Sequence, residues 1–463
     1  MNSVRKLAIV IATVMLTLSA GSAYATNGYF THGLGTKNKG MAGAGLAMPG
    51  DAISVANNPA AAVFATGRLD AGAALFSPLR SYSSSPSLAN GNGGAFTIGP
   101  NDLDSSREYF VIPHIAYSWE LSSESAFALA FYGRGGMNSE WDGGTASFDP
   151  TGQAGAPGTF PGTFGAGAFG QGATAGVDLS QAFLDVAYAR KAGDNFAWGA
   201  ALVIAVQSFS AKGVGSFAGF TETFAASGGT QFPTNLSGNG HEFSYGAGAK
   251  IGFQANLGAS TSLAAAYTSE IGMTELDKYA DLFAEQGGFD IPANAKIGLT
   301  FRPRDTVAIS IDAEHTWFSD VASVGNSIFN LFSCPTANPL ATDLSSCLGG
   351  SNGAGFGWDD MTVYKLGIEW GVGSDMVWRA GYSHGDQPIP NSEVMFNILA
   401  PATIEDHFAA GFTRKSGQSS EWSVSVMYAP KNDVTGPNPF DPTQTITIEM
   451  YQWEVEFGYS WNF

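Results

Sequence analysis

Downstream of residue 66 the chain alternates between apolar and polar side chains with a period of two, the pattern of β-strands whose two faces meet different surroundings. Each alternating segment is close to or above the ~10 residues that a tilted strand needs to cross a bilayer. The pattern predicts 14 strands: 66–82, 107–119, 125–138, 178–191, 195–209, 241–256, 260–273, 292–303, 305–318, 361–373, 376–386, 404–415, 420–430 and 445–463. An even number of such strands is typical of a closed transmembrane barrel.

The connections between these strands alternate in length. Tight turns such as KAGDN, NLGAS and RPRD follow every second strand. Long segments separate the others: 83–106, 139–177, 210–240, 274–291, 319–360, 387–403 and 431–444. Tight turns at one end and long loops at the other are characteristic of outer-membrane barrels.

The final strand indicates which face is turned to lipid. In YQWEVEFGYSWNF the aromatic residues and Val455 share one face, and Gln452, Glu454 and Glu456 share the other. Aromatic side chains at strand ends form the girdles at the membrane surface, so the polar face lines the lumen. We therefore predict an all-β, 14-stranded antiparallel transmembrane barrel.

The first residues indicate export. Arg5 and Lys6 precede an apolar stretch that ends in a small-x-small motif, Ala23 to Ala25, which is the pattern of a cleaved secretory signal peptide over residues 1–25. A retained membrane anchor is the alternative, but the apolar stretch is short for a span. A terminal Phe463 on an aromatic strand also resembles the C-terminal signature of bacterial outer-membrane proteins, so we expect a multi-pass barrel in that membrane.

Charge and composition exclude several functions. The chain contains 60 Gly and has a formal net charge of -19, and it becomes more acidic once the signal peptide is removed. Nucleic-acid binding requires a basic face, so we expect none. Cys334 and Cys347 share one Gly/Ser-rich stretch, and in an exported chain they are expected to form a disulfide. A metal pair is the weaker alternative; we expect no metal and no cofactor.

Residues 26–65 precede the first strand and are rich in Gly and Ala. A lumen surrounded by 14 strands is too wide for wall side chains to fill. We predict that this segment is a partly helical hatch inside the barrel, with residues 66–463 forming the barrel and its loops. Asn58 and Pro59 mark a break between short helical turns, followed by Ala60. A disordered tail is the alternative for this Gly-rich segment.

Three stretches carry a family resemblance: GMAGAGLAMPGDAISVANNPAAAVF after the signal peptide, GWDDMTVYKLGIEW at 357–370 and PIPNSEVMFNILAPATIEDHFAAGF at 388–412. Together they resemble the outer-membrane long-chain fatty-acid transporter family, the FadL/TodX type, which includes uptake channels for aromatic hydrocarbons. The resemblance implies a monomeric barrel in outer-membrane lipid and lipopolysaccharide, with an Asn-Pro-Ala hatch motif at Asn58, Pro59 and Ala60. It also implies passive uptake of hydrophobic molecules, without enzymatic activity, through a loop groove, an internal pocket and a lateral exit.

Candidate ligand-binding residues lie in two long loops. Leu276, Tyr279 and Phe283 have the spacing of one helical face in the loop 274–291. The loop before it contributes Phe217, Phe220 and Phe224. These side chains either form the expected groove or pack the loops as a cap over the barrel.

The third predicted strand is interrupted by glycine. Gly133, Gly135 and Gly136 allow a bulge or kink, which matches the lateral opening that the resemblance implies. Arg134 lies beside them. We hypothesise that Arg134, with lumen-facing Lys365 or Arg379, contacts an acidic head group; the alternative is that these cations balance lumen carboxylates.

Two other classes of function, an esterase and an open general porin, fit the sequence less well. GYSHG, residues 381–385, matches the G-x-S-x-G motif of esterases, but that motif requires a helix after the serine, and Pro388 and Pro390 exclude one. Ser383 and His384 would also point to opposite faces of a strand. An open general porin would lack the hatch. Fatty acids and neutral aromatic or alkane hydrocarbons require similar apolar linings, so the substrate stays open between them.

Overall fold

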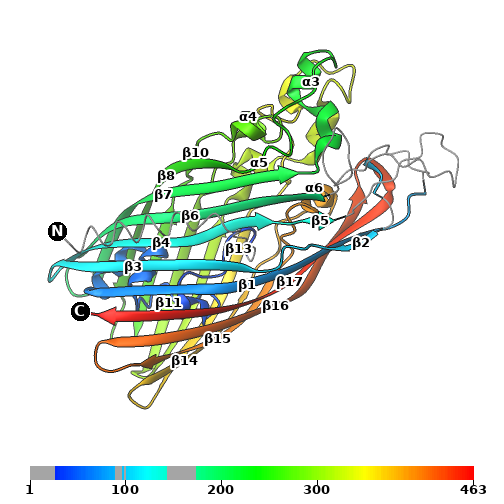
Figure 1. Cartoon of the computed structure of the whole chain (residues 1–463). Coiled ribbons are helices and arrows are strands. Elements are labelled where there is room, and N and C mark those ends of the chain that lie inside the picture. The colour runs from blue at the N-terminus through cyan, green and yellow to red at the C-terminus, as the bar shows by residue number, and fades with distance from the viewer. Residues whose placement is uncertain (1–26, 89–95, 99–100, 143–173) are drawn as a thin grey trace.

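The structure, a computed structural model, describes residues 27–88, 96–98, 101–142 and 174–463. One antiparallel sheet closes on itself because β1 pairs with β17 as well as with β3 (Figure 1). Fourteen strands form the wall: β1 (Arg68–Ser84), β3 (Phe110–Ser122), β4 (Ser125–Asn138), β6 (Thr174–Lys191), β7 (Phe196–Lys212), β8 (Glu242–Asn256), β9 (Thr261–Thr268), β11 (Asn294–Arg304), β12 (Val307–Thr316), β13 (Met361–Val372), β14 (Met376–His384), β15 (Asp406–Lys415), β16 (Ser420–Asn438) and β17 (Asp441–Asn462). Closure pairs the backbone groups between strands, as a bilayer requires.

The predicted fold class is confirmed, with two corrections to the strand boundaries. The predicted loop 431–444 is largely a continuation of β16 and β17, which stay paired to Asn438 and Asp441. The predicted strand 260–273 is interrupted, because β9 ends at Thr268 and a separate short strand, β10 (Gly272–Met273), follows. Two further short strands, β2 (Asn101–Asp104) and β5 (Trp141–Asp142), lie at the loop end. The predicted signal peptide, residues 1–25, and most of the predicted loop 139–177 lie outside the described residues.

The two faces of the wall have the predicted polarity. On β17 the outward residues Val455 and Phe457 are exposed, whereas Glu454 and Glu456, which alternate with them, are buried in the lumen. The same alternation on β8 leaves Phe243 and Ile251 exposed. An apolar outer face and a polar lumen identify a barrel that is solvated by lipid.

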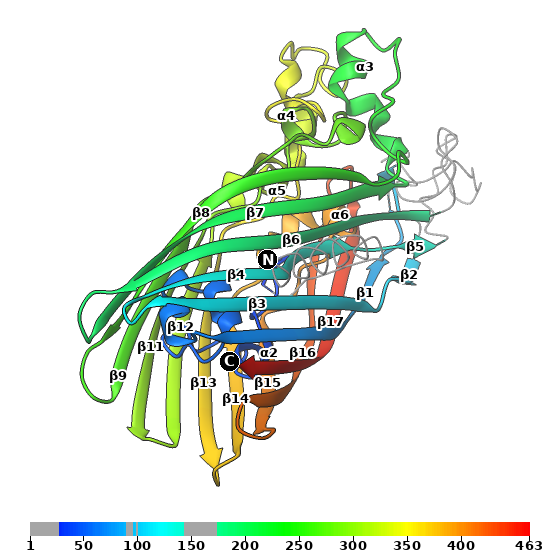
Figure 2. The same cartoon turned by 60° about the vertical axis from the view of Figure 1, so that its left-hand side comes forward.

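The N-terminal segment, residues 27–65, lies within the barrel near the end that carries the short turns (Figures 1 and 2). It contains α2 (Thr36–Lys39) and two 3-10 helices, η1 (Ala52–Ala56) and η2 (Pro59–Phe64). Most of its side chains are buried. Two wall glycines allow its close approach: a Cβ at Gly381 would lie 2.1 Å from the backbone of Met41, and one at Gly199 would lie 2.5 Å from that of Pro59. Glycine therefore serves here as a site of backbone contact.

The other helices are short and lie at the loop end (Figure 2). They are η5 (Gly215–Phe220), α3 (Glu222–Ala226), η6 (Asp277–Tyr279), α4 (Ala284–Gly287), η7 (Phe318–Asp320), α5 (Ala322–Gly325), η8 (Ile328–Ser333), η9 (Leu344–Ser346), η10 (Asn391–Glu393) and α6 (Val394–Asn397). Within the described ranges, none of the helices has the length and apolarity that a membrane span requires.

Candidate functional site: a loop pocket and a gap in the wall

A gap separates β3 from β4 over part of their length. The two strands pair only from His114 and Tyr132 to the turn. Beyond that point β4 stays paired with β6, with a register shift between Gly133 and Gly135. Pro113, which lacks an N–H, lies on β3 at the edge of the gap. The glycine stretch predicted to kink the third strand therefore lies where the wall separates.

The N-terminal segment takes the place of β3 beside the gap. Phe30 bridges to Gly135, the Thr31 N–H donates to the Arg134 carbonyl at 2.8 Å, and the Gly136 N–H donates to the Tyr29 carbonyl at 3.0 Å. The freed backbone groups of β4 thus gain new partners. Such pairing is required because an unpaired backbone group in lipid costs several kcal/mol.

The Asn-Pro-Ala motif packs the N-terminal segment against the wall. The Asn58 side chain accepts a hydrogen bond from the Ala60 N–H at 3.0 Å and donates to the Phe253 carbonyl of β8, also at 3.0 Å. Pro59 is the first residue of η2, where a missing N–H costs nothing. The motif therefore ends one helical turn, begins the next and fixes both to the barrel.

Lumen lysines bind the same segment through its carbonyls. Lys250 donates to the Ala56 carbonyl at 2.7 Å, and Lys365 donates to the His32 carbonyl at 3.0 Å. Lys39, on the segment itself, lies 2.9 Å from Glu454 and 2.8 Å from Glu456. Burial lowers the pKa of His32, so its ring stays neutral beside these cations. Charged hydrogen bonds of this kind are the stronger ones in a protein interior.

The three cations proposed for a ligand head group have carboxylate partners within the protein. Glu314 lies 3.3 Å from Arg134 and 2.6 Å from Lys365, and Arg134 also stacks on Phe30 at 4.1 Å. Arg379 is separate: it lies 2.6 Å from Glu369 and lines a 290 Å³ cavity below the N-terminal segment. This arrangement favours the alternative, that the cations balance lumen carboxylates. The head-group role stays a prediction that the geometry disfavours.

An apolar pocket lies beneath the loops, where several of them converge on β6 and β7. We call it the loop pocket; it is lined by Val177, Phe209, Val214, Phe217, Leu282, Phe283, Ser323, Leu348, Ala354, Gly355, Phe356, Phe396 and Leu399. Its free volume is 30 Å³, whereas a cavity that binds benzene has about 150 Å³. A ligand of that size would enter only after the loops separate.

The structure distributes the predicted groove residues between three environments. Phe217 and Phe283 line the loop pocket, while Leu276 and Tyr279 are fully buried beside it. Phe220 and Phe224 lie further out: the Phe220 ring is 5.7 Å from Phe440, and the Phe224 ring is 5.1 Å from Phe232. The predicted helical face in 274–291 is wrong, because only short turns form there and Glu285 and Gln286 have positive φ. The burial of Leu276, Tyr279 and Phe283 therefore comes from the packing of irregular loops.

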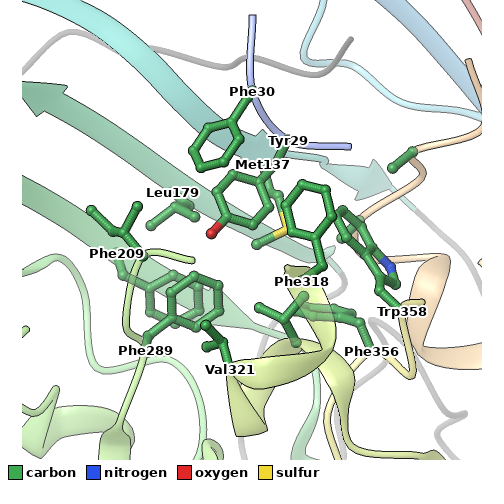
Figure 3. Close-up of a cluster of buried hydrophobic side chains, with 14 of the residues drawn as sticks. Tyr29, Phe30, Met137, Leu179, Phe209, Phe289, Phe318, Val321, Phe356 and Trp358 are labelled. Carbon is green, nitrogen blue, oxygen red and sulfur yellow. The ribbon is translucent and has the colours of Figure 1, made fainter. Parts of the chain in front are cut away.

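A chain of packed aromatic rings, which we call the aromatic path, extends from Phe283 of the loop pocket to Phe30 beside the gap; Figure 3 shows three of its rings, Phe289, Tyr29 and Phe30. The Phe283 ring lies 4.9 Å from Phe289, which lies 6.3 Å from Tyr29, and Tyr29 lies 4.7 Å from Phe30 at the gap. Phe318 and Trp358 pack against Tyr29 from the opposite side. An apolar molecule moving along this path would exchange one set of ring contacts for another.

A disulfide and a buried carboxylate hold the loops over the pocket. Cys334 and Cys347 form a disulfide with a Cα–Cα distance of 4.8 Å, which closes the loop between β12 and β13. Glu393 accepts hydrogen bonds from the Ser327 hydroxyl at 2.6 Å and the Ile328 N–H at 2.9 Å, joining two loops. Burial raises the pKa of Glu393.

The GYSHG stretch lies within and just after β14, and no helix follows the serine directly. Ser383 is buried in the lumen and lies 3.3 Å from His407, whereas His384 lies 2.9 Å from Asp406. Gly381 is required by the contact with Met41. Among the described residues no cluster of three or more His, Cys, Asp or Glu side chains could hold a metal ion.

Several residues of the site were not predicted. Val177, Phe209 and Phe396 line the loop pocket, and Glu314 contacts three cations. Gln181 of β6 is the register partner of Gly135 on β4, next to the gap. Strict alternation places Gln181 on the lumen face of its strand, which was a usable signal; the others depend on contacts between distant segments.

The fold defines a 14-stranded β-barrel of the outer-membrane type, with an apolar pocket under its loops and a break in the pairing of β3 and β4. The family model for outer membrane protein transport proteins (OMPP1/FadL/TodX) matches residues 16–436, and the chain belongs to this family. Its members are outer-membrane transport proteins for hydrophobic compounds, not enzymes.

Solved structures share the fold. The toluene transporter TodX of P. putida is 15% identical, with 94% of this chain and 99% of that chain covered and a TM-score of 0.61. A FadL homologue of Pseudomonas aeruginosa is 15% identical, with 96% and 100% covered and a TM-score of 0.59. The toluene transporter TbuX of Ralstonia pickettii is 12% identical, with 94% and 99% covered and a TM-score of 0.55. No curated protein sequence matches the chain.

Proposed function

We propose that this protein mediates passive uptake of neutral hydrophobic molecules, such as monoaromatic hydrocarbons, across the outer membrane. The molecule would enter between the loops, occupy the loop pocket, follow the aromatic path and leave sideways through the gap between β3 and β4. We expect a monomer surrounded by outer-membrane lipid and lipopolysaccharide.

The observation that carries this proposal is the chemistry of the loop pocket. Its lining is apolar except for Ser323, and it contains no cation. Burying apolar surface stabilises a ligand by about 25 cal/mol per Å², so a molecule of benzene size needs no charged group to bind. The toluene transport named for TodX and TbuX supports the same substrate class.

Uptake of long-chain fatty acids stays a prediction. A carboxylate would require a cation that it can reach, and Arg134, Lys365 and Arg379 are buried on carboxylates of the protein. An uncompensated carboxylate in an apolar site is strongly disfavoured.

The test is uptake of labelled toluene and labelled oleate by a bacterium that lacks its own transporter and expresses this chain. We expect saturable toluene uptake and no oleate uptake above the empty-vector control. Oleate uptake that other long-chain acids suppress would restore the fatty-acid hypothesis. Uptake of neither compound would refute the proposal.

The role of the N-terminal segment as a hatch is tested in the same cells. Pro59→Ala should leave the barrel folded but change toluene uptake, because it frees the backbone between η1 and η2. Ala201→Ser on β7, a change of similar size in the lumen, is the control. Equal uptake at equal surface expression would count against a hatch rearrangement at this motif.

A further inference from the structure

The outer face of the wall carries a notch of 250 Å³ at the gap between β3 and β4. Residues of β3, β4, β6, β7 and β8 contribute to it. It is lined by Pro113, Phe131, Gly133, Ser180, Gln181, Ala182, Phe183, Leu184, Ile204, Val206, Ser208, Phe243 and Tyr245. Apart from Ser180, Gln181, Ser208 and the Tyr245 hydroxyl, this lining is apolar.

The notch faces lipid and is separated from the lumen. Its residues Ile204, Phe243 and Tyr245 belong to the outward face of the wall and are 37%, 55% and 56% exposed. On the lumen side Phe183 is buried, and its ring stacks on that of Tyr132 with 5.5 Å between the centroids. Surrounding lipid therefore reaches the notch, while packed rings separate it from the lumen.

The notch lies in the half of the apolar band that is nearer the loops. On β7 the outward face is apolar from Trp198 to Val206 and becomes polar at Ser208 and Ser210. The notch includes Ile204, Val206 and Ser208, so it lies at the loop end of this apolar face. Long loops face the outside of the cell in outer-membrane barrels. The notch is therefore at the level of the outer leaflet, which in a bacterial outer membrane is formed by lipopolysaccharide.

An acyl chain is the occupant that suits this lining. An empty notch would leave its side chains without contacts on one side. A buried water needs two to four polar partners, and most of the lining offers none. An acyl chain forms no hydrogen bond, and Pro113 at the edge of the gap has no N–H that such a neighbour would leave unpaired.

The occupant exchanges easily with other apolar molecules. Lipid tails are as apolar as the side chains of the notch, so the hydrophobic effect does not hold an acyl chain there. What favours the chain is its packing against the lining and its abundance as the solvent of the barrel. Another apolar molecule that packs equally well therefore replaces it by mass action.

We propose that one acyl chain of an outer-leaflet lipopolysaccharide molecule occupies the notch and seals the gap until a transported molecule displaces it. The occupancy goes beyond the proposed function. The displacement rests on the proposed function, because exit through the gap is part of it. A molecule that leaves the aromatic path then enters a site already filled with hydrocarbon.

The occupancy is tested by photocrosslinking in cells that express the full chain with p-benzoylphenylalanine in place of Phe243, at the rim of the notch. The control carries this photoreactive residue in place of Phe408 of β15, which lies outside the notch. Both positions are near the loop end of their strands, and they are 55% and 52% exposed. We expect about fivefold more lipopolysaccharide adduct at position 243, which corresponds to about 1 kcal/mol of additional packing. Equal amounts at both positions, or mainly phospholipid at position 243, would overturn the proposal.

A variant that fills the notch tests the same point. Ala182→Phe places a ring in the notch and should lower the adduct at position 243 to the level of the control. Ala200→Phe, the same change on the outward face of β7 but outside the notch, should leave that adduct unchanged. Equal adducts in the two variants would overturn the assignment of the lipid to the notch.

The displacement is tested by adding toluene before irradiation. Toluene should lower the lipopolysaccharide adduct at position 243 and leave that at position 408 unchanged. A decrease at both positions, or at neither, would refute the displacement. Absence of toluene uptake by cells with the wild-type protein would instead refute the proposed function, and the comparison of the two positions without toluene would still decide the occupancy.

Discussion

Glu314→Gln should release the N-terminal segment from the barrel wall. The Glu314 carboxylate lies 3.3 Å from Arg134, 3.3 Å from Lys296 and 2.6 Å from Lys365. Two of these cations hold the segment directly: Lys365 donates to the His32 carbonyl and Lys296 donates to the Asn57 side chain, each at 3.0 Å. The substitution keeps the shape of the side chain and removes the charge.

The magnitude follows from the burial of this cluster. Removing one partner of a buried ion pair costs about 3–5 kcal/mol, because the other charge is left uncompensated. A loss of about 3 kcal/mol corresponds to a change of more than about a hundredfold in an equilibrium constant. We therefore expect backbone amides of residues 27–65 to exchange hydrogen at least about a hundredfold faster in detergent micelles, while the barrel strands keep their protection.

The control is Glu449→Gln, which removes a carboxylate from the pair with the exposed Lys431 and should change nothing. Lys365→Met in the Glu314→Gln background should lower the protection further, because Lys365 also donates to the His32 carbonyl at 3.0 Å. If Glu314→Gln and Glu449→Gln give the same exchange rates, the cluster does not hold the segment.

Gly381→Val should displace the N-terminal segment, because the backbone of Met41 would lie 2.1 Å from the new Cβ, and the variant should then admit polar antibiotics that the wild-type protein excludes. Gly258→Val is the control: it lies in open space and should leave the exclusion of these antibiotics unchanged. Cys334→Ser should expose the loop between β12 and β13 to protease without lowering the melting temperature of the barrel, and identical digestion patterns would contradict this. Because burial raises the folded-state pKa of Glu393 above its unfolded value, its docking against the neighbouring loop should be strongest below the ordinary carboxyl pKa and weaken as pH rises through the raised pKa. Glu393→Gln should remove this dependence in hydrogen exchange measured from pH 4 to 8; a dependence that persists would assign it to another group.

The barrel itself was predictable because the side chains of each strand alternate between lipid and lumen, and this alternation is visible within the strand. Alternation along one strand, such as Glu454 and Glu456 against Val455 and Phe457, needs no knowledge of other strands. The glycine kink near Gly135 was also predicted from a single strand, because the glycines interrupt its alternation. Prediction from single strands failed at 431–444, where polar strands extend beyond the membrane and no longer alternate against lipid.

The site was less predictable because its contacts join segments far apart in the chain. Arg134 and Glu314 are 180 residues apart, so the charge at Arg134 suggested a ligand while its partner could not be seen. The loop residues were chosen for a helical face that does not form. Their burial depends on how irregular loops pack on Phe209, which a periodic pattern does not encode.

Beside the gap, β4 forms hydrogen bonds with the N-terminal segment instead of β3. These hydrogen bonds limit which part of the segment can move. Tyr29 and Thr31 supply two backbone hydrogen bonds to β4 beside the gap, at 3.0 and 2.8 Å. Withdrawing them would leave peptide groups of the wall without partners next to lipid, at several kcal/mol each. Residues Tyr29 to Thr31 are therefore an anchored part of the barrel wall. Any passage that the N-terminal segment opens has to pivot on residues that follow Thr31.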